Sequence, residues 1–249
     1  MSGHSKWHSI KHQKGVADAR RGQLFTKLTR ELIIAAREGG GNPEMNFRLR
    51  LAVQKARDSN MPMENIERAI KKGTGELEGG SLAELTLEGY GPGGTAIMVN
   101  ALTDNRNRTI QEVRSTFTRH GSSLGESGCV SWIFDSKGLI TLKAEGVDAD
   151  ELALSAIDAG AEDVKVEDGY VYVYTVKDDL ENVRKALESQ GMEIESSEIS
   201  MVPKNLIELD EKSAVQALKL MEKLEENDDI QNVYTNADFP DAVLESYES

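Results

Sequence analysis

The stretch that decides the fold runs from Leu139 to Val202 and reads LITLKAEGVDADELALSAIDAGAEDVKVEDGYVYVYTVKDDLENVRKALESQGMEIESSEISMV. Apolar patterning predicts four strands, over residues 139–142, 164–167, 170–175 and 192–202. Asp168-Gly169, between the middle two strands, is a strong hairpin signal. Amphipathic segments at 148–159 and 178–190 predict two helices. The resulting order, β-α-β-β-α-β, is that of a ferredoxin-like domain, which we place at 138–203.

The two segments that flank this domain together contain the elements of one further α/β domain. Residues 76–137 carry two predicted strands, a helix that starts in a capping box at Thr109, and an apolar strand over 129–134. They lack a second helix and a last strand, which residues 204–249 supply. We therefore predict a discontinuous α/β domain, 76–137 and 204–249, with the ferredoxin-like domain inserted. Three sequential domains are the weaker alternative, because a piece of about 45 residues rarely sustains its own core.

Three amphipathic segments between residues 23 and 75 predict a small helical bundle. We expect Asn42 to cap the second helix, with Pro43 in its first position. Residues 1–22 are basic with few large apolar groups, which predicts a flexible arm. The predicted fold class is α+β multidomain, with an N-terminal three-helix bundle and two α/β domains, one ferredoxin-like domain being inserted in the other.

The net charge of −14 hides a split along the chain. Residues 1–75 carry fifteen Lys and Arg against seven Asp and Glu, a net of +8, whereas residues 76–137 carry −3 and residues 138–249 carry −19. Such asymmetry is typical of a basic segment that meets polyanions. A basic but merely solvated helical surface is the competing interpretation, since a basic patch alone does not prove binding.

The basic head is the predicted nucleic-acid-binding part, because cations spread over several helix faces suit backbone phosphates. The candidate binding residues are Lys6, Trp7, Lys11, Lys14, Arg20, Arg21, Lys27 and Arg30. Trp7 belongs to this set because an aromatic ring in an arm can stack on a base, although it can equally dock on another domain.

A second candidate site is the segment 104–109, which leads directly into a predicted helix. Free N–H groups at a helix start and two arginines favour an anion. The candidate anion-binding residues are Arg106, Arg108 and Thr109. The alternative is a turn folded by Asp104 and Asn105, with the arginines solvated.

Catalytic and metal-binding patterns are missing. The sequence has no G-x-S-x-G, no H-E-x-x-H and no P-loop. His4, His8 and His12 recur at helical spacing, but no cysteine or acid completes a ligand set near them. The acidic pair Asp228-Asp229 means little in so acidic a chain, and Cys129 in an apolar segment is typical of a buried small hydrophobe. We expect no enzyme activity, metal or cofactor. A phosphate enzyme built on Arg106 and Arg108 is the competing class.

Several motifs resemble the YebC/PmpR family. They are Gly3-His4-Ser5-Lys6-Trp7, Phe25-Thr26-Lys27-Leu28, Asn60-Met61-Pro62, Glu88-Gly89-Tyr90-Gly91-Pro92-Gly93-Gly94 and Leu102-Thr103-Asp104-Asn105-Arg106-Asn107-Arg108-Thr109. The resemblance covers essentially the whole chain and is densest over residues 1–135. His8 stands where the family often has a small residue.

The resemblance implies a cytoplasmic, non-enzymatic protein of three domains. Family members are described as DNA-binding transcriptional regulators. A close relative is a mitochondrial translational activator of a cytochrome oxidase subunit, and some bacterial members resemble ribosome-associated factors that help translate proline-rich stretches. Our hypothesis is a transcriptional regulator that binds promoter DNA through the basic head. The alternative is a translation factor on ribosomal RNA.

The location follows from what the sequence lacks. It has no apolar signal region and no apolar run of about 20 residues, so we expect neither secretion nor a membrane partner. Its one cysteine fits a reducing cytoplasm. No small-molecule substrate is inferred.

Overall fold

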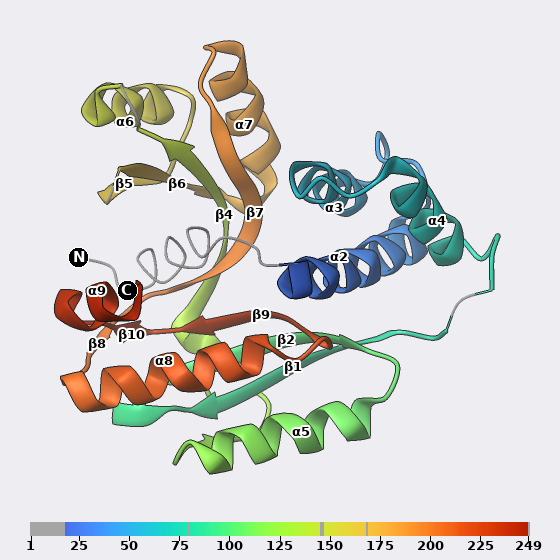
Figure 1. Ribbon diagram of the computed structural model, residues 1–249. Helices are drawn as coiled ribbons and strands as arrows, with labels where there is room; N and C mark the ends of the chain where they lie inside the picture. The colour runs from blue at the N-terminus through green and yellow to red at the C-terminus, as the bar shows by residue number, and fades with distance from the viewer. Residues whose placement is uncertain (1–17, 79, 145–146, 168, 249) are drawn as a thin grey trace. The chain divides into compact units, whose positions relative to one another are not determined.

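The structure is a computed structural model that describes residues 18–78, 80–144, 147–167 and 169–248. This part of the chain divides into two compact units (Figure 1). One comprises residues 133–206. The other comprises residues 18–132 together with 207–248, and it contains both the helical bundle and the sheet that the two flanking segments build.

The bundle consists of α2 (Asp18–Gly39), α3 (Phe47–Asp58) and α4 (Met63–Gly73). The residues that fill its core are at most 6% exposed and include Leu28, Leu32, Leu49, Val53 and Ile66. Helices α2 and α4 are closely packed at Gly73. A Cβ atom at this position would lie 2.5 Å from the carbonyl oxygen of Ile33. Only glycine fits this contact without displacing the backbone of α2.

Helix α2 begins earlier than predicted, at Asp18 instead of residue 23. Residues 18–22 of the predicted arm are therefore helical. The rest of the predicted arm, residues 1–17, lies outside the described residues.

Helix α3 begins later than predicted, and Asn46 caps it in place of Asn42. The Asn46 side-chain oxygen accepts a hydrogen bond from the N–H of Leu49 at 3.0 Å, while its amide donates to the carbonyls of Ala35 and Gly40. One buried side chain thus starts α3 and ties it to the end of α2. Asn42 and Pro43 instead belong to the preceding turn, because the Asn42 side chain accepts from the N–H of Glu44.

The same unit contains a four-stranded sheet in the order β3-β1-β2-β9. Its strands are β1 (Ala83–Tyr90), β2 (Ala96–Thr103), β3 (Ser123–Leu124) and β9 (Ile230–Thr235). Strand β2 pairs antiparallel with both β1 and β9, so segments more than 120 residues apart in sequence form one sheet. A short turn of 3-10 helix, η1 (Pro92–Gly94), joins β1 to β2.

Three helices and a short strand pair complete this part. Helix α5 (Arg106–Arg119) contacts β1 and β3, and α8 (Glu211–Glu225) contacts β9 and α5. Beyond them lie β8 (Ile207–Glu208), β10 (Ala237–Asp238) and α9 (Asp241–Glu248). The helix from 106 to 119 starts three residues before the predicted capping box. Asn105 caps it by accepting from the N–H of Arg108, which frees Thr109 to face the interior.

Residues 133–206 form a second four-stranded sheet, fully antiparallel, in the order β5-β6-β4-β7. Its strands are β4 (Phe134–Lys143), β5 (Asp163–Glu167), β6 (Tyr170–Val176) and β7 (Ile194–Pro203). The helices are α6 (Ala149–Asp158) and α7 (Leu180–Ser189), the latter preceded by η3 (Lys177–Asp179). With the first and third strands central, this is the ferredoxin-like arrangement. The predicted fold class is confirmed.

The prediction of an apolar strand over residues 129–134 is wrong. Residues 131–133 form a turn of 3-10 helix, η2, and the strand that follows, β4, begins only at Phe134. The cause is Glu88, a carboxylate 4% exposed that accepts the backbone N–H groups of Gly128, Val130 and Ser131. Burial alone would raise the pKa of Glu88, but these three donors outweigh it and lower the pKa. Backbone donors bound to Glu88 cannot join a strand ladder.

We predict that Asn46→Ala destabilises the protein by about 2–4 kcal/mol, because it removes a helix cap and leaves buried backbone groups unpaired. The control Asn42→Ala changes an exposed residue and should cost under about 1 kcal/mol. Urea unfolding of both variants measures the difference. Equal losses would show that the cap lies at Asn42.

Candidate nucleic-acid interface

Four of the eight predicted binding residues, Lys6, Trp7, Lys11 and Lys14, lie outside the described residues. Arg20 lies in the first turn of α2, but its side chain is likewise outside the description. Arg21 is exposed, and its guanidinium carbon lies 5.7 Å from the centroid of the Phe25 ring. The nucleic-acid role of these residues stays a prediction.

Lys27 and Arg30 face the α/β part of their own unit. Three α2 side chains donate hydrogen bonds to backbone carbonyls at the end of α8 and just beyond it: Gln23 to Glu226, Lys27 to Glu225 at 2.6 Å, and Arg30 to Asp228. The last carbonyls of a helix lack partners within the helix and carry the negative end of its dipole. The stripe on α2 therefore caps α8 and holds the bundle against the sheet domain.

The strongest contacts converge on the Asp229 cluster, which we define as Asp229 with Arg30, Thr103, Arg108 and Thr109. Asp229 Oδ1 lies 2.9 Å from Arg30 Nη1, and Oδ2 lies 2.8 Å from Arg108 Nη2. The hydroxyls of Thr109 and Thr103 donate to Oδ2 at 2.6 and 3.1 Å. The Asp229 side chain is 4% exposed, so its charge is stabilised by these donors in place of water.

The cluster changes the acidity of Asp229. Burial alone would raise the pKa of this carboxyl group. The hydrogen bonds from Arg108 and Thr109, the charge of Arg30 and the hydroxyl of Thr103 outweigh burial, and together they hold the pKa below its ordinary value. Asp229 is therefore an ionised carboxylate at neutral pH.

Two of the three predicted anion-binding residues belong to this cluster. Arg108 also pairs with Asp104 at 2.8 Å, and Thr109 is fully buried. The start of α5 thus holds an anion, but this anion is the protein's own carboxylate. Arg106 is exposed and has no ion pair within the described ranges. Binding of an external anion by Arg106, Arg108 and Thr109 stays a prediction.

Sequence reasoning missed Asp229, which looked like one acid among many. A signal was present, since Thr103, Arg108 and Thr109 fall within seven residues of each other beside a strand end. The buried hydroxyls of Thr103 and Thr109 require a hydrogen-bond acceptor, and the adjacent Arg108 favours an anionic one. The sequence does not show which of the 43 acidic residues supplies it.

Other cations of the bundle separate into paired and unpaired sets. Arg37 donates to the carbonyl of Leu82, and Arg48 forms ion pairs with Glu31, Glu38 and Glu84. By contrast, the exposed side chains that lack a hydrogen bond or ion pair within the described part of the chain are Arg57, Arg68 and Lys71. These three lie at the end of α3 and on α4.

The described residues contain no group of three or more His, Cys, Asp or Glu side chains placed to hold a metal ion. The histidines at positions 4, 8 and 12 lie outside that search. No helix in the described ranges is long and apolar enough to cross a membrane. Cys129 is half-buried, and burial together with the nearby Glu88 charge raises the pKa of its thiol, which disfavours the reactive thiolate.

We predict that Asp229→Ala destabilises the protein by about 3–5 kcal/mol, because it leaves the largely buried Arg30 guanidinium and the buried hydroxyls of Thr103 and Thr109 without their carboxylate partner. The matched control is Asp228→Ala, which removes a neighbouring carboxylate outside the cluster. Chemical unfolding of both variants gives the comparison. A loss at Asp229 no larger than at Asp228 would contradict the role of the cluster.

The lowered pKa of Asp229 predicts acid sensitivity. Its contribution to stability is complete above the ordinary pKa of about 4 and is lost as the pH falls through the lowered folded-state value. The stability of Asp229→Asn should therefore fall less steeply below about pH 4 than that of the parent. Unfolding curves between neutral and strongly acidic pH test this slope. Parallel pH profiles would refute it.

Comparison with known proteins agrees with this architecture. A family model described as the TACO1/YebC protein N-terminal domain matches residues 5–76, and one described as the TACO1/YebC second and third domain matches residues 82–237. A protein of Dehalococcoides mccartyi (strain CBDB1) named "probable transcriptional regulatory protein" is 61% identical over 249 residues, covering 100% of this chain and 99% of the relative.

Two further relatives extend the comparison. A protein of the same name from Geobacter sulfurreducens is 55% identical over 98% of this chain and 99% of its own. The crystal structure of a conserved hypothetical protein from Aquifex aeolicus superposes with a TM-score of 0.87 at 51% identity, covering 93% of this chain and 96% of that one. The matches span both compact units, and they show that the chain belongs to the TACO1/YebC family.

Proposed function

We propose that this protein is a nucleic-acid-binding regulator that controls transcription by binding promoter DNA through its basic head. The names of its relatives support a regulatory role. The observation that carries the proposal is a set of exposed cations on the bundle that have no ion pair or hydrogen bond among the described residues, in the same +8 segment as the predicted arm. No catalytic step is required.

We propose a revised set of residues that contact phosphate. We keep Lys6, Trp7, Lys11, Lys14, Arg20 and Arg21 as predicted contacts, and we add Arg57, Arg68 and Lys71. We leave Lys27 and Arg30 out of the proposed set, because both donate to backbone carbonyls at or just beyond the end of α8 and Arg30 also pairs with Asp229. Long cationic side chains without internal partners gain most from phosphate, since no ion pair must first be broken.

Acidic residues elsewhere in the chain support the same orientation. Residues 138–249 carry a net charge of −19, which repels a nucleic-acid backbone. Contact with a polyanion is then favoured at the basic head, and weak non-specific binding elsewhere is disfavoured.

We predict that the double variant Arg68→Glu with Lys71→Glu weakens binding to a duplex oligonucleotide at least tenfold at low salt. Two lost phosphate contacts should also reduce the slope of log K against log salt by about 2. The control, Lys212→Glu with Lys219→Glu on α8, makes the same change in net charge on exposed side chains. Fluorescence anisotropy measures both. Equal weakening by the control would remove the bundle from the mechanism.

The choice of nucleic acid requires an experiment in cells. Crosslinking followed by sequencing of bound DNA and RNA should enrich promoter DNA. Enrichment of ribosomal RNA over promoters would overturn the transcriptional proposal and support a translation factor instead. The Arg68 and Lys71 double variant serves as the control in either case, because it tests whether the same surface is used.

A further inference from the structure

Helix α5 is a basic element in an acidic part of the chain. Its sequence, RNRTIQEVRSTFTR, contains four arginines and one glutamate, a net charge of +3, whereas residues 76–137 together carry −3. The helix lies at the periphery of its unit and contacts β1 and β3 (Figure 1). Its inward side chains Val113 and Phe117 are at most 1% exposed, so the opposite side of the helix faces solvent.

The outward side of α5 carries a line of four exposed polar residues, which we term the α5 stripe: Asn107, Gln111, Arg114 and Thr118. Their spacing of four, three and four residues places them one above the other along the helix. Within the described part of the chain, the side chains of Asn107, Gln111 and Arg114 have no hydrogen bond or ion pair. These amide and guanidinium groups are therefore available to a partner.

No carboxylate belongs to the α5 stripe. Glu112, the one acid of the helix, projects about 100° away from Gln111 around the helix axis. The Glu112 carboxylate accepts a hydrogen bond from the side-chain amide of Asn227 at 2.7 Å, which holds it at the flank of the helix. The charge of the stripe is thus complementary to a polyanion, in spite of the negative charge of the whole chain.

Buried contacts hold α5 in place. Arg108 pairs with Asp229 at 2.8 Å, and the hydroxyl of Thr109 donates to the same carboxylate. Further along, Phe117 packs directly on β1, since a Cβ at Gly89 would lie 2.7 Å from its ring. A stripe on a helix that is fixed in this way contacts a partner with little further loss of conformational entropy.

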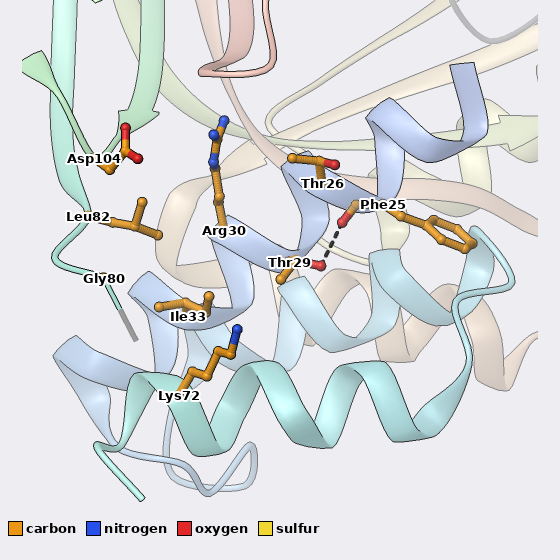
Figure 2. A pocket seen from close by; sticks show the side chains of 9 residues that line it. All are labelled: Phe25, Thr26, Thr29, Arg30, Ile33, Lys72, Gly80, Leu82 and Asp104. Carbon is orange, nitrogen blue, oxygen red and sulfur yellow. Dashed lines mark hydrogen bonds between the residues drawn. The ribbon is translucent and has the colours of Figure 1, made fainter. Parts of the chain in front are cut away.

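The pocket beside the start of α5 lacks a comparable arrangement. Its volume is about 420 Å³, and residues of α2 and α4 line it together with Asp104. Its two cations do not converge, because the Arg30 guanidinium and the Lys72 ammonium lie on opposite sides of α2 (Figure 2). Arg30 is also bound to Asp229. Donors suited to one partner thus lie in line on the outward side of α5 and not in the pocket.

Arginine and glutamine are suited to the edges of bases in the major groove of DNA. Arginine binds O6 and N7 of guanine, and glutamine binds N6 and N7 of adenine. The Cβ atoms of residues three apart on a helix, such as Gln111 and Arg114, are about 5–6 Å apart, which is one to two base-pair steps of about 3.4 Å. The major groove of B-DNA is about 12 Å wide and admits one α-helix.

We propose that α5 enters the major groove of duplex DNA, where Gln111 and Arg114 contact the edges of neighbouring base pairs. Arg106 and Arg119, the first and last residues of the helix, contact the flanking phosphates. Both are exposed, and neither has an ion pair or a hydrogen bond from its side chain among the described residues.

This inference rests on the proposed function and adds to it. The cations of the bundle meet phosphates, and phosphate contacts carry no sequence information. A regulator that acts at particular promoters also requires contacts to base edges. The α5 stripe supplies these contacts from a different element of the same unit.

The test exposes the full chain to duplex DNA of random sequence, sequences the bound fraction, and measures affinity for the selected duplex by fluorescence anisotropy. We expect the parent to enrich a short sequence motif. The double variant Gln111→Ala with Arg114→Ala should lose this enrichment and bind the selected duplex about tenfold more weakly. Alanine favours a helix, so these exposed substitutions leave α5 folded, which unfolding curves verify.

The matched control is Gln216→Ala with Lys219→Ala on α8. It removes one amide and one cation from exposed positions at the same spacing. The control should keep the enrichment and an affinity within about twofold of the parent. Equal loss in the control would overturn the inference, and so would an unchanged motif in the α5 variant or a parent that binds DNA without sequence preference.

Two comparisons complete the test. The major groove of duplex RNA is too narrow for side chains to read, so RNA of the selected sequence should bind independently of Gln111 and Arg114. An equal effect of the α5 variant on RNA would contradict the groove contact. A parent that binds no DNA removes the proposed function itself. DNA binding that depends on Arg68 and Lys71 but not on the α5 stripe removes this inference alone.

Discussion

One buried carboxylate organises the larger unit of this protein. Asp229 lies just before β9 and accepts hydrogen bonds from α2, from the end of β2 and from the first turn of α5. An ionised group that is 4% exposed persists only when its charge is matched by donors, so these elements must meet at a fixed point. The cap of α8 by Lys27 and Gln23 adds to the same junction.

The contacts at this junction separate the cations of the basic head into two groups, those bound within the protein and those exposed to solvent. Lys27 and Arg30 on α2 bind backbone carbonyls near the end of α8, and Arg30 also binds the carboxylate of Asp229. These contacts fix the orientation of the bundle relative to the sheet of the same unit. In the proposed function, the cations on α4 and at the end of α3 are the ones that contact an external partner. A net charge of +8 therefore overstates the number of cations that are available to nucleic acid.

Local signals in the sequence predicted much of the fold, because period, hairpin and cap residues act over a few positions. The helix and the last strand expected within residues 204–249 are present as α8 and β9, and the ferredoxin-like order follows from such signals. The errors share one cause. Asn46, Glu88 and Asp229 each bind groups distant in sequence, and such pairings override local preference. The contacts of the candidate binding residues were the hardest feature to predict. Helix periodicity places Lys27 and Arg30 outside the bundle core, but it does not reveal the α/β part of the same unit that they contact.

A double-mutant cycle on Arg30 and Asp229 tests the central claim most directly. Arg30→Ala, Asp229→Ala and the combined variant are compared by chemical unfolding, which isolates the interaction between the two side chains. If Asp229 holds the bundle on the sheet domain through Arg30, the coupling free energy should be about 1.5 kcal/mol or more. Additive losses, with a coupling within about 0.3 kcal/mol of zero, would contradict the account.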